Sequence, residues 1–232
     1  KKLVVESLLK NGLRTPSQWN IPTSTLRFSL EKICKIFPKN TQDLHFEHDQ
    51  LAGLPVEKIS PNNSAGHVIL FIHGGLFMLG SQHSYRALMC SLVQRTQLPV
   101  IHIDYPLAPE ASPNQLIQSC EDALAWVYQN RKQFKILKNR ISVAGDSAGC
   151  NISTVVAQRS AHKVYAPQAQ LLLYPVVDFK SRHPSFYAYK DGLLLTGEDM
   201  DFVTHYYAEQ HQVELDDPII SPTYGKHDRL PP

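Results

Sequence analysis

The stretch Gly145-Asp146-Ser147-Ala148-Gly149 decides how this chain can be interpreted. It follows the short apolar run 141–144 and precedes a run of small and apolar residues at 150–157. Glycines around a serine let a strand and a helix approach closely, so that a sharp turn pushes the serine hydroxyl out at its tip. The stretch therefore predicts a strand, a turn and a helix, with Ser147 as a candidate nucleophile. Alone it is weak evidence, because many Gly-Ser-Gly turns carry no chemistry.

A glycine-rich loop follows a second apolar run. Residues 68–72, Val-Ile-Leu-Phe-Ile, read as a buried strand that leads into His73-Gly74-Gly75-Leu76-Phe77. Backbone N–H groups of such a loop can point at one spot, as a developing oxyanion requires. The alternative is a strand-to-helix turn with incidental glycines, and the serine turn farther along the chain makes that alternative less attractive.

Strands and helices alternate along the middle of the chain. Continuous apolar or near-apolar runs at 68–72, 100–103, 141–144 and 170–173 are typical of strands buried on both faces. The segments between them have helical periodicity, clearest after Pro113, where an apolar stripe comprises Leu116, Ile117, Cys120, Leu124, Val127 and Tyr128. This alternation predicts an α/β fold with a mostly parallel central sheet flanked by helices.

The segments around this alternation have other patterns. Apolar residues recur at helical spacing through about residue 37: Leu3, Leu8, Leu9, Leu26, Leu30, Ile33 and Ile36. Residues 44–48 and 54–59 predict two antiparallel strands, separated by Ala52-Gly53. The segment from Ser181 to about Glu214 is rich in aromatic residues, which can cover the sheet or form the underside of a cap, and the two interpretations are compatible. With no repeat or linker, 1–232 is expected to be a single domain.

Several motifs together resemble, in order, the signatures of the hormone-sensitive-lipase-like branch of the α/β-hydrolases, a family of carboxylesterases and acetyl esterases. The motifs are His73-Gly74-Gly75, Asp104-Tyr105-Pro106-Leu107-Ala108-Pro109-Glu110, Gly145-Asp146-Ser147-Ala148-Gly149, Leu173-Tyr174-Pro175-Val176-Val177-Asp178, Asp191-Gly192-Leu193-Leu194-Leu195-Thr196 and Asp217-Pro218-Ile219-Ile220-Ser221-Pro222. The resemblance covers nearly the whole chain.

The resemblance implies an α/β-hydrolase fold with a helical cap. Residues 1–40 and about 181–214 would form the cap, 41–180 the core sheet and helices, and 215–232 the link that precedes the family's seventh strand. In the family, the seventh and eighth strands carry the acid and the histidine of the catalytic triad, and neither has a matching position here. We therefore expect a chain that is cut before the seventh strand, with the triad Asp and His beyond Pro232.

The implied chemistry is that of a serine carboxylesterase acting on short- to medium-chain acyl esters through an acyl-enzyme on Ser147. Gly74, Gly75, Leu76 and Ala148 would supply the N–H groups of the oxyanion hole, and His73 would support the loop. The chain as given is expected to have little turnover, because loss of the histidine typically removes several orders of magnitude of rate. The alternative is a non-catalytic ligand-binding relative of the same fold.

Two features concern the details of this site. Leu76 stands where the family normally has a third glycine, so we expect a narrowed site or an altered oxyanion loop, and a positive φ at this residue would be strained. Asp178 is a conceivable substitute acid, although a structural carboxylate is the simpler interpretation. The histidines of the cap and the final loop are expected to be surface or packing residues: His183, His205, His211 and His227.

Composition excludes several other classes. A formal net charge of +2 without a basic run gives no reason to expect nucleic-acid binding, and no apolar stretch is long enough for a signal peptide or a membrane span. We expect a cytoplasmic protein that needs no cofactor and acts on a small-molecule ester, and the sequence specifies no oligomeric state.

The four cysteines have neither the spacing of a metal site nor that of a redox dithiol, and the side chain of Cys150 should point into the packed interior. His45 and His48 would face opposite sides of a strand, so no metal site is expected.

Overall fold

The computed structural model describes residues 22–36, 39–63, 66–138, 140–192 and 195–232. Its strands are β1 (Leu44–Leu51), β2 (Leu54–Pro61), β3 (Val68–Ile72), β4 (Val100–Ile103), β5 (Ile141–Asp146) and β6 (Ala169–Leu173). Its helices are α2 (Thr23–Cys34), α3 (Gln82–Thr96), α4 (Pro113–Gln129), α5 (Ala148–Ser160), α6 (Pro184–Tyr189) and α7 (Gly197–Tyr207), with short 3₁₀ turns η2 (Glu209–His211) and η3 (Pro222–Tyr224).

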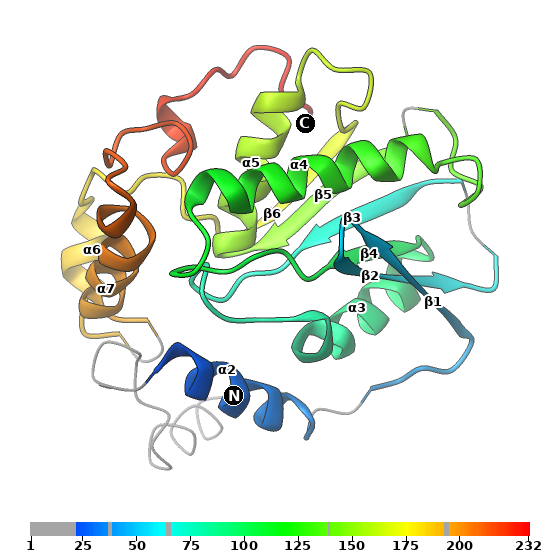
Figure 1. Ribbon diagram of the computed structural model, residues 1–232, viewed down its shortest axis with the longest axis horizontal. Helices are drawn as coiled ribbons and strands as arrows, with labels where there is room; N and C mark the ends of the chain where they lie inside the picture. Colours follow the sequence, from blue (N-terminus) through cyan, green and yellow to red (C-terminus); the bar gives the residue numbers. More distant parts are fainter. Residues whose placement is uncertain (1–21, 37–38, 64–65, 139, 193–194) are drawn as a thin grey trace.

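The described strands form one mixed sheet in the order β1-β2-β4-β3-β5-β6 (Figure 1). β4, β3, β5 and β6 run parallel, whereas β1 and β2 form an antiparallel hairpin that joins β4. The predicted antiparallel pair and the predicted mostly parallel core are thus both confirmed. Ile72 pairs with Gly145, so β3 and β5 end side by side, and the loop after β3 begins next to the turn that holds Ser147.

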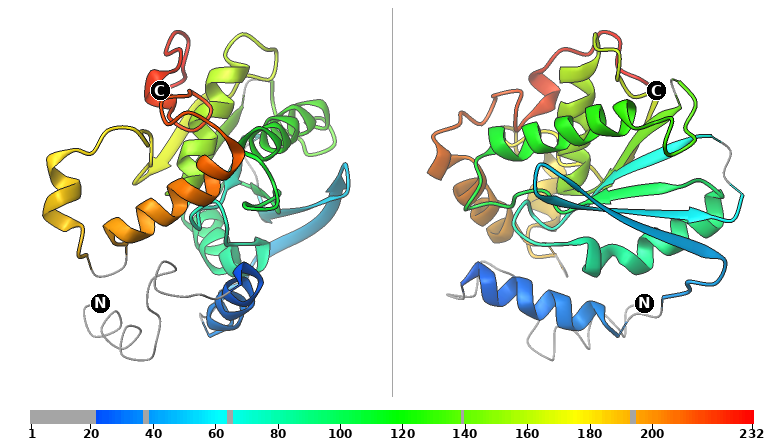
Figure 2. Two further views of the ribbon diagram at one scale, coloured as in Figure 1. Left: turned by 60° about the vertical axis from the view of Figure 1, so that its left-hand side comes forward. Right: turned by 45° about the vertical axis from the view of Figure 1, so that its right-hand side comes forward.

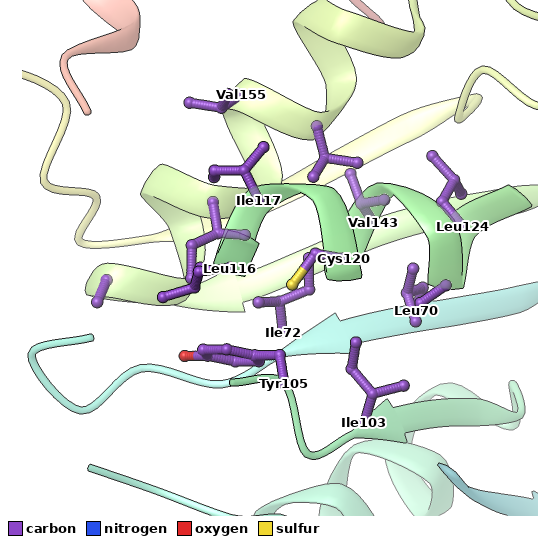
Figure 3. Close-up of a cluster of buried hydrophobic side chains, with 14 of the residues drawn as sticks. Leu70, Ile72, Ile103, Tyr105, Leu116, Ile117, Cys120, Leu124, Val143 and Val155 are labelled. Carbon is purple, nitrogen blue, oxygen red and sulfur yellow. The ribbon is translucent and has the colours of Figure 1, made fainter. Parts of the chain in front are cut away.

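Alternate residues of the central strands enter two separate apolar clusters. On one face, Leu70 and Ile72 of β3 and Val143 of β5 pack against α4 and α5, including the predicted stripe of α4 (Figure 3). On the other face, Ile69 and Phe71 pack against Met89, Cys90 and Val93 of α3. Because both faces are covered, the whole of β3 is buried and its sequence is apolar without alternation.

Among the described helices, three begin with reciprocal hydrogen bonds that the sequence makes possible. Ser81, Ser112 and Thr196 each accept a hydrogen bond from the N–H three residues on, and the side chain at that later position bonds back to the N-cap N–H. Such capping boxes satisfy N–H groups that a helix start otherwise leaves without partners. α4 also has Pro113 at its first turn, where a missing N–H costs nothing.

The expectation that β6 is buried on both faces is wrong. β6 lies at the edge of the described sheet, and Leu171 and Leu173 are 46% and 36% exposed. Leu171 pairs with Ala144, whose side chain belongs to the α3 face, so the exposed leucines lie on that face. An apolar run indicates which residues can be buried, but it does not indicate whether a helix reaches that part of the sheet. Gln170 pairs through its backbone N–H with the carbonyl of Pro232, 2.8 Å away.

The helices predicted at both ends are present where the structure describes the chain. α2 ends at Cys34, short of the predicted boundary near residue 37, and Leu3, Leu8 and Leu9 lie outside the described residues. α6 and α7 lie beside the end of the sheet at which β3 and β5 finish (Figures 1 and 2). Tyr207 of α7 stacks on Phe77 of the loop after β3, with ring centroids 3.8 Å apart. None of the described helices is both long and apolar enough to cross a membrane.

Helix α5 starts almost in contact with the end of β3. A methyl group added to Gly149 would lie 2.7 Å from the carbonyl carbon of His73 and closer still to the carbonyl oxygen of Ile72. One added to Gly145 would lie 2.7 Å from the same Ile72 oxygen. Only glycine permits this approach, so both glycines of the serine turn are required by packing.

A buried histidine lies in the centre of the sheet. His102 of β4 is fully buried, and neither of its ring nitrogens has a hydrogen-bond partner among the described residues. Its ring contacts those of Phe71 and His73 edge-on. Burial lowers the pKa of His102 well below its ordinary value, so the ring is neutral in the folded protein at neutral pH.

Acid should destabilise the fold through His102. Below about pH 6.5 the unfolded chain protonates this histidine while the folded chain does not, so stability should fall by about 1 kcal/mol per pH unit as the pH is lowered further. Urea unfolding at several pH values would measure this slope. The slope should decrease in His102→Phe and stay unchanged in the exposed control His205→Phe, and an unchanged slope in His102→Phe would contradict the assignment.

Because α5 approaches β3 so closely, even a methyl group at Gly149 should lower the stability of the fold strongly. Gly149→Ala should lower the free energy of unfolding by about 3 kcal/mol or more, because rigid backbone atoms must move. Gly53→Ala is the control: φ is +85° there and nothing lies within 4 Å, so only backbone strain of about 1 kcal/mol applies. Urea unfolding would measure both losses of stability. Equal losses in the two variants would show that the close contact of Gly149 with β3 adds nothing to the cost of the substitution.

Candidate active site

Ser147 occupies a strained turn between β5 and α5. Its backbone has φ 51° and ψ −118°, an unfavourable conformation for a residue with a side chain. The turn is held because the N–H of Ser147 donates to the carbonyl of Leu173 at 2.9 Å and its own carbonyl accepts from the N–H of Cys150 at 3.1 Å. The side chain is half-buried. This is the sharp strand-to-helix turn that the sequence predicts.

The loop after β3 is also strained. φ is +113° at Gly75, +59° at Leu76 and +62° at Phe77, so three successive residues lie in the left-handed region. The turn is closed by the N–H groups of Met78 and Leu79, which both donate to the carbonyl of Gly75, at 3.0 and 2.8 Å. Leu76 therefore has the positive φ at which a side chain is strained, and its half-buried side chain packs at the border of the apolar core.

Two other segments hold this loop. The carbonyl of Phe77 accepts a hydrogen bond from the N–H of Ala108 at 2.9 Å. Arg27 of α2 donates through Nε to the carbonyl of Met78 at 2.7 Å and through Nη2 to that of Ala108 at 2.8 Å. The same guanidinium pairs with both carboxylate oxygens of Glu110. The loop is thus tied to α2 and to the segment after β4.

His73 is buried beneath the loop. Its Nδ1 lies 2.7 Å from the carbonyl oxygen of Gly74, its ring stacks on Tyr105, and the Tyr105 hydroxyl donates to the His73 carbonyl at 2.6 Å. Burial lowers the pKa of His73 to about 4, so the ring is neutral and donates from Nδ1 to the carbonyl. A methyl group on Gly80 would lie 2.7 Å from Cε1 of the ring and closer still to Nδ1. The ring fills the space behind the loop.

Asp146 joins the loop to the serine turn. Its Oδ1 accepts a hydrogen bond from the N–H of Gly74 at 2.9 Å, and its Oδ2 accepts one from the hydroxyl of Tyr85 on α3, also at 2.9 Å. Burial raises the pKa of Asp146, and these two hydrogen bonds act in the opposite direction. Asp146 immediately precedes Ser147, so the carboxylate fixes the loop relative to the candidate nucleophile.

The N–H groups near Ser147 differ in availability. The N–H of Gly74 is already bonded to Asp146. By contrast, among the described residues nothing accepts a hydrogen bond from the N–H of Gly75 or Leu76. Ala148 is the first residue of α5, where an N–H has no acceptor within the helix. Gly75, Leu76 and Ala148 therefore have N–H groups free to bind an anionic oxygen, whereas Gly74 has a bracing contact.

Among the described residues, no candidate base hydrogen bonds to Ser147. In the described part of the chain, no side chain hydrogen bonds to the Ser147 hydroxyl. Asp178 instead accepts hydrogen bonds from the N–H groups of Lys180 and Ser181, both at 2.9 Å, and lies 3.8 Å from the exposed His183. Burial raises the pKa of Asp178, but the hydrogen bonds from Ser181 and Lys180 outweigh burial, so the pKa lies below its ordinary value. This geometry is that of a carboxylate that stabilises its own turn.

The other histidines of the final segments make local contacts. His205 lies 3.0 Å from Glu209 one helical turn away, and His227 bonds to the carbonyl of Thr223 at 3.0 Å. The Nε2 of His211 is buried without a partner in the described chain. None of them hydrogen bonds to Ser147.

The remaining sequence expectations concern cysteines and metals. Cys150 is fully buried, and its Sγ donates to the carbonyls of Gly145 and Leu173 at 2.9 and 3.1 Å, so it points into packing as expected. All four cysteines lie in the described residues and are free thiols. His45 contacts Asn62 and His48 lies near Glu57. Within the described residues no three His, Cys, Asp or Glu side chains gather as a metal site would require.

Sequence reasoning missed three residues that shape the site: Arg27, Tyr85 and Asp146. Asp146 stands inside the serine motif. An acidic residue expected beside a glycine-rich loop was the signal that could have indicated its role. Arg27 lies 51 residues from Met78, and Tyr85 lies 61 residues from Asp146, so no local pattern links these pairs.

Comparison with known proteins agrees with this geometry. The family described as alpha/beta hydrolase fold matches residues 69–232. An esterase from Acinetobacter venetianus is 37% identical over the whole chain, which spans 75% of that relative. An ethyl acetate hydrolase from Pseudomonas putida is 33% identical over 74% of the chain and 56% of its own length.

Solved structures show the same fold. A hyperthermophilic esterase from Pyrobaculum calidifontis matches all of this chain and 77% of its own with a TM-score of 0.88 at 24% identity. The resemblance to the hormone-sensitive-lipase-like esterases is thus confirmed at the level of the family. The strained serine turn, the glycine loop beside it and the family match over 69–232 show that this chain belongs to the alpha/beta hydrolase fold family.

Proposed function

We propose that this chain is a serine carboxylesterase that hydrolyses short- to medium-chain acyl esters through an acyl-enzyme on Ser147. Esterases among its relatives support the substrate class. In the proposed reaction the Ser147 oxygen attacks the ester carbonyl, the alkoxide leaves with a proton, and water releases the acid from the acyl-serine. No cofactor is needed, because nucleophile and oxyanion donors are protein groups.

The observation that carries the proposal is the strained Ser147 turn next to a strained loop with free N–H groups. The loop and the turn are neighbours because Gly74 bonds to Asp146 and Ile72 pairs with Gly145. We assign the oxyanion donors to Gly75, Leu76 and Ala148, and we assign bracing roles to Gly74 and His73. Each donor would contribute about 3 kcal/mol to transition-state stabilisation.

The proposal includes slow turnover by the 232-residue chain. A serine hydroxyl needs a base to accept its proton, and none of the described side chains bonds to Ser147. Loss of the triad histidine typically lowers the rate by several orders of magnitude, although oxyanion stabilisation remains. An external base should therefore increase the rate.

Hydrolysis of p-nitrophenyl acetate should be slow, dependent on Ser147 and accelerated by added imidazole. We expect imidazole at millimolar concentration to raise the rate by about tenfold or more, because it supplies the proton acceptor that general-base catalysis requires. A fluorophosphonate probe, located by peptide mass mapping, should modify Ser147. Ser147→Ala should abolish the labelling and the protein-dependent hydrolysis, which is the rate left after the reaction with imidazole alone is subtracted.

Ser153→Ala is the matched control, because Ser153 lies in α5 and is buried, and its hydroxyl donates to the carbonyl of Ala144 at 3.3 Å. It should keep the labelling and the imidazole effect. Hydrolysis that persists in Ser147→Ala, or labelling at another residue, would contradict the proposed nucleophile. Tight binding of an ester without any acyl transfer would favour the non-catalytic ligand-binding relative.

Leu76→Gly should widen the site. The substitution removes a side chain next to the proposed donors and relieves a φ of +59°, a strain of about 1 kcal/mol in an L-residue. Relative to acetate, esters with branched acyl groups should gain about tenfold in kcat/KM, which corresponds to relief of a steric contact. Steady-state kinetics on both esters would measure the ratio. An unchanged ratio would show that the Leu76 side chain does not limit the acyl group.

A further inference from the structure

Tyr85 stands outside every motif of the sequence, yet it contacts the groups behind the proposed oxyanion loop. It lies in the first half of α3, with its ring among those of Phe71, His73 and His102 at centroid distances of 6.2, 5.2 and 6.0 Å. These rings come from β3, from the loop after it and from β4. The Tyr85 ring is therefore held on several sides, and its hydroxyl has a defined position.

The hydroxyl has one strong partner. It donates to Oδ2 of Asp146 at 2.9 Å, while Oδ1 of the same carboxylate accepts from the N–H of Gly74 at 2.9 Å. One carboxylate thus receives one hydrogen bond from α3 and one from the loop. Such charge-assisted hydrogen bonds are about twice as strong as neutral ones.

The packing around the carboxylate leaves little freedom. A methyl group on Gly74 would lie 2.7 Å from Asp146 Oδ2 and 2.6 Å from the Asp146 carbonyl oxygen, so only a glycine fits against this side chain. Burial raises the pKa of the Tyr85 phenol, which therefore remains a proton donor over the whole working pH range. If the phenol donor were lost, the buried carboxylate would lose one of its donors, and its Oδ2 would move toward another donor or solvent.

We propose that Tyr85 is a positioning residue for the oxyanion loop: its hydroxyl holds Asp146, Asp146 holds the N–H of Gly74, and the N–H groups of Gly75 and Leu76 are thereby aimed at the carbonyl that Ser147 attacks. The catalytic consequence rests on the proposed esterase function. Tyr85 itself does not touch the reacting atoms, so its effect should appear in kcat and in the dynamics of the loop, with KM nearly unchanged.

The test is Tyr85→Phe, which keeps the ring and removes only the hydroxyl. Amide hydrogen exchange, followed by NMR, should show the N–H of Gly74 exchanging about tenfold faster than in the wild type, because local opening becomes easier. In imidazole-assisted hydrolysis of p-nitrophenyl acetate, kcat should fall about tenfold while KM changes less than about twofold.

Tyr165→Phe is the matched control, because the Tyr165 hydroxyl also donates to a carboxylate oxygen, that of Glu121 at 3.1 Å. It should change neither the Gly74 exchange rate nor kcat. In an Asp146→Ala background, adding Tyr85→Phe should have almost no further effect on either quantity, since the carboxylate that links the two sites is gone.

The two proposals fail in different ways. Gly74 exchange that is unchanged in Tyr85→Phe, or faster exchange with an unchanged kcat, would overturn the positioning role. An equal effect of Tyr165→Phe would also overturn it. A wild-type chain that shows no Ser147-dependent reaction, even with imidazole, would instead contradict the proposed esterase function.

Discussion

The contact between the start of α5 and the end of β3 is the constraint on which the site depends. Gly145 and Gly149 flank Ser147, both lie against the carbonyl oxygen of Ile72, and Gly149 also lies against the carbonyl of His73. Without side chains at these two positions, the helix can begin directly beside the neighbouring strand. Ser147 is then held in its strained conformation by surrounding backbone, and the loop that begins at His73 starts within hydrogen-bond distance of Asp146.

Buried parts of the molecule hold the loop that follows β3. The two apolar clusters fix β3 between α4 and α5 on one face and α3 on the other. On this frame, the neutral ring of His73 fills the space under the loop, and Phe77 is stacked on Tyr207. The strained backbone at Leu76 and Phe77 persists because the stabilisation from these contacts exceeds the cost of a left-handed conformation.

The parts of the fold that sequence reasoning predicted are those with a periodic or local signal. A few neighbouring residues are enough to recognise each of these parts: the stripe of α4, the apolar runs of β3 and β5, and the glycines of the serine turn. β6 was misjudged because its apolar run does not reveal its place at the sheet edge. The bracing roles of Tyr85 and Arg27 depend on hydrogen bonds between distant segments, and no periodicity records such pairs.

Arg27 shows how the described N-terminal helix is attached. Its guanidinium uses Nε, Nη1 and Nη2 at once, on two carbonyls and one carboxylate. The donors of a guanidinium lie in one plane with fixed directions. α2 is therefore set in orientation as well as in place: if the helix turned about its axis or slid along it, several of these bonds would break together. The loop that follows β3 and helix α2 should consequently move together.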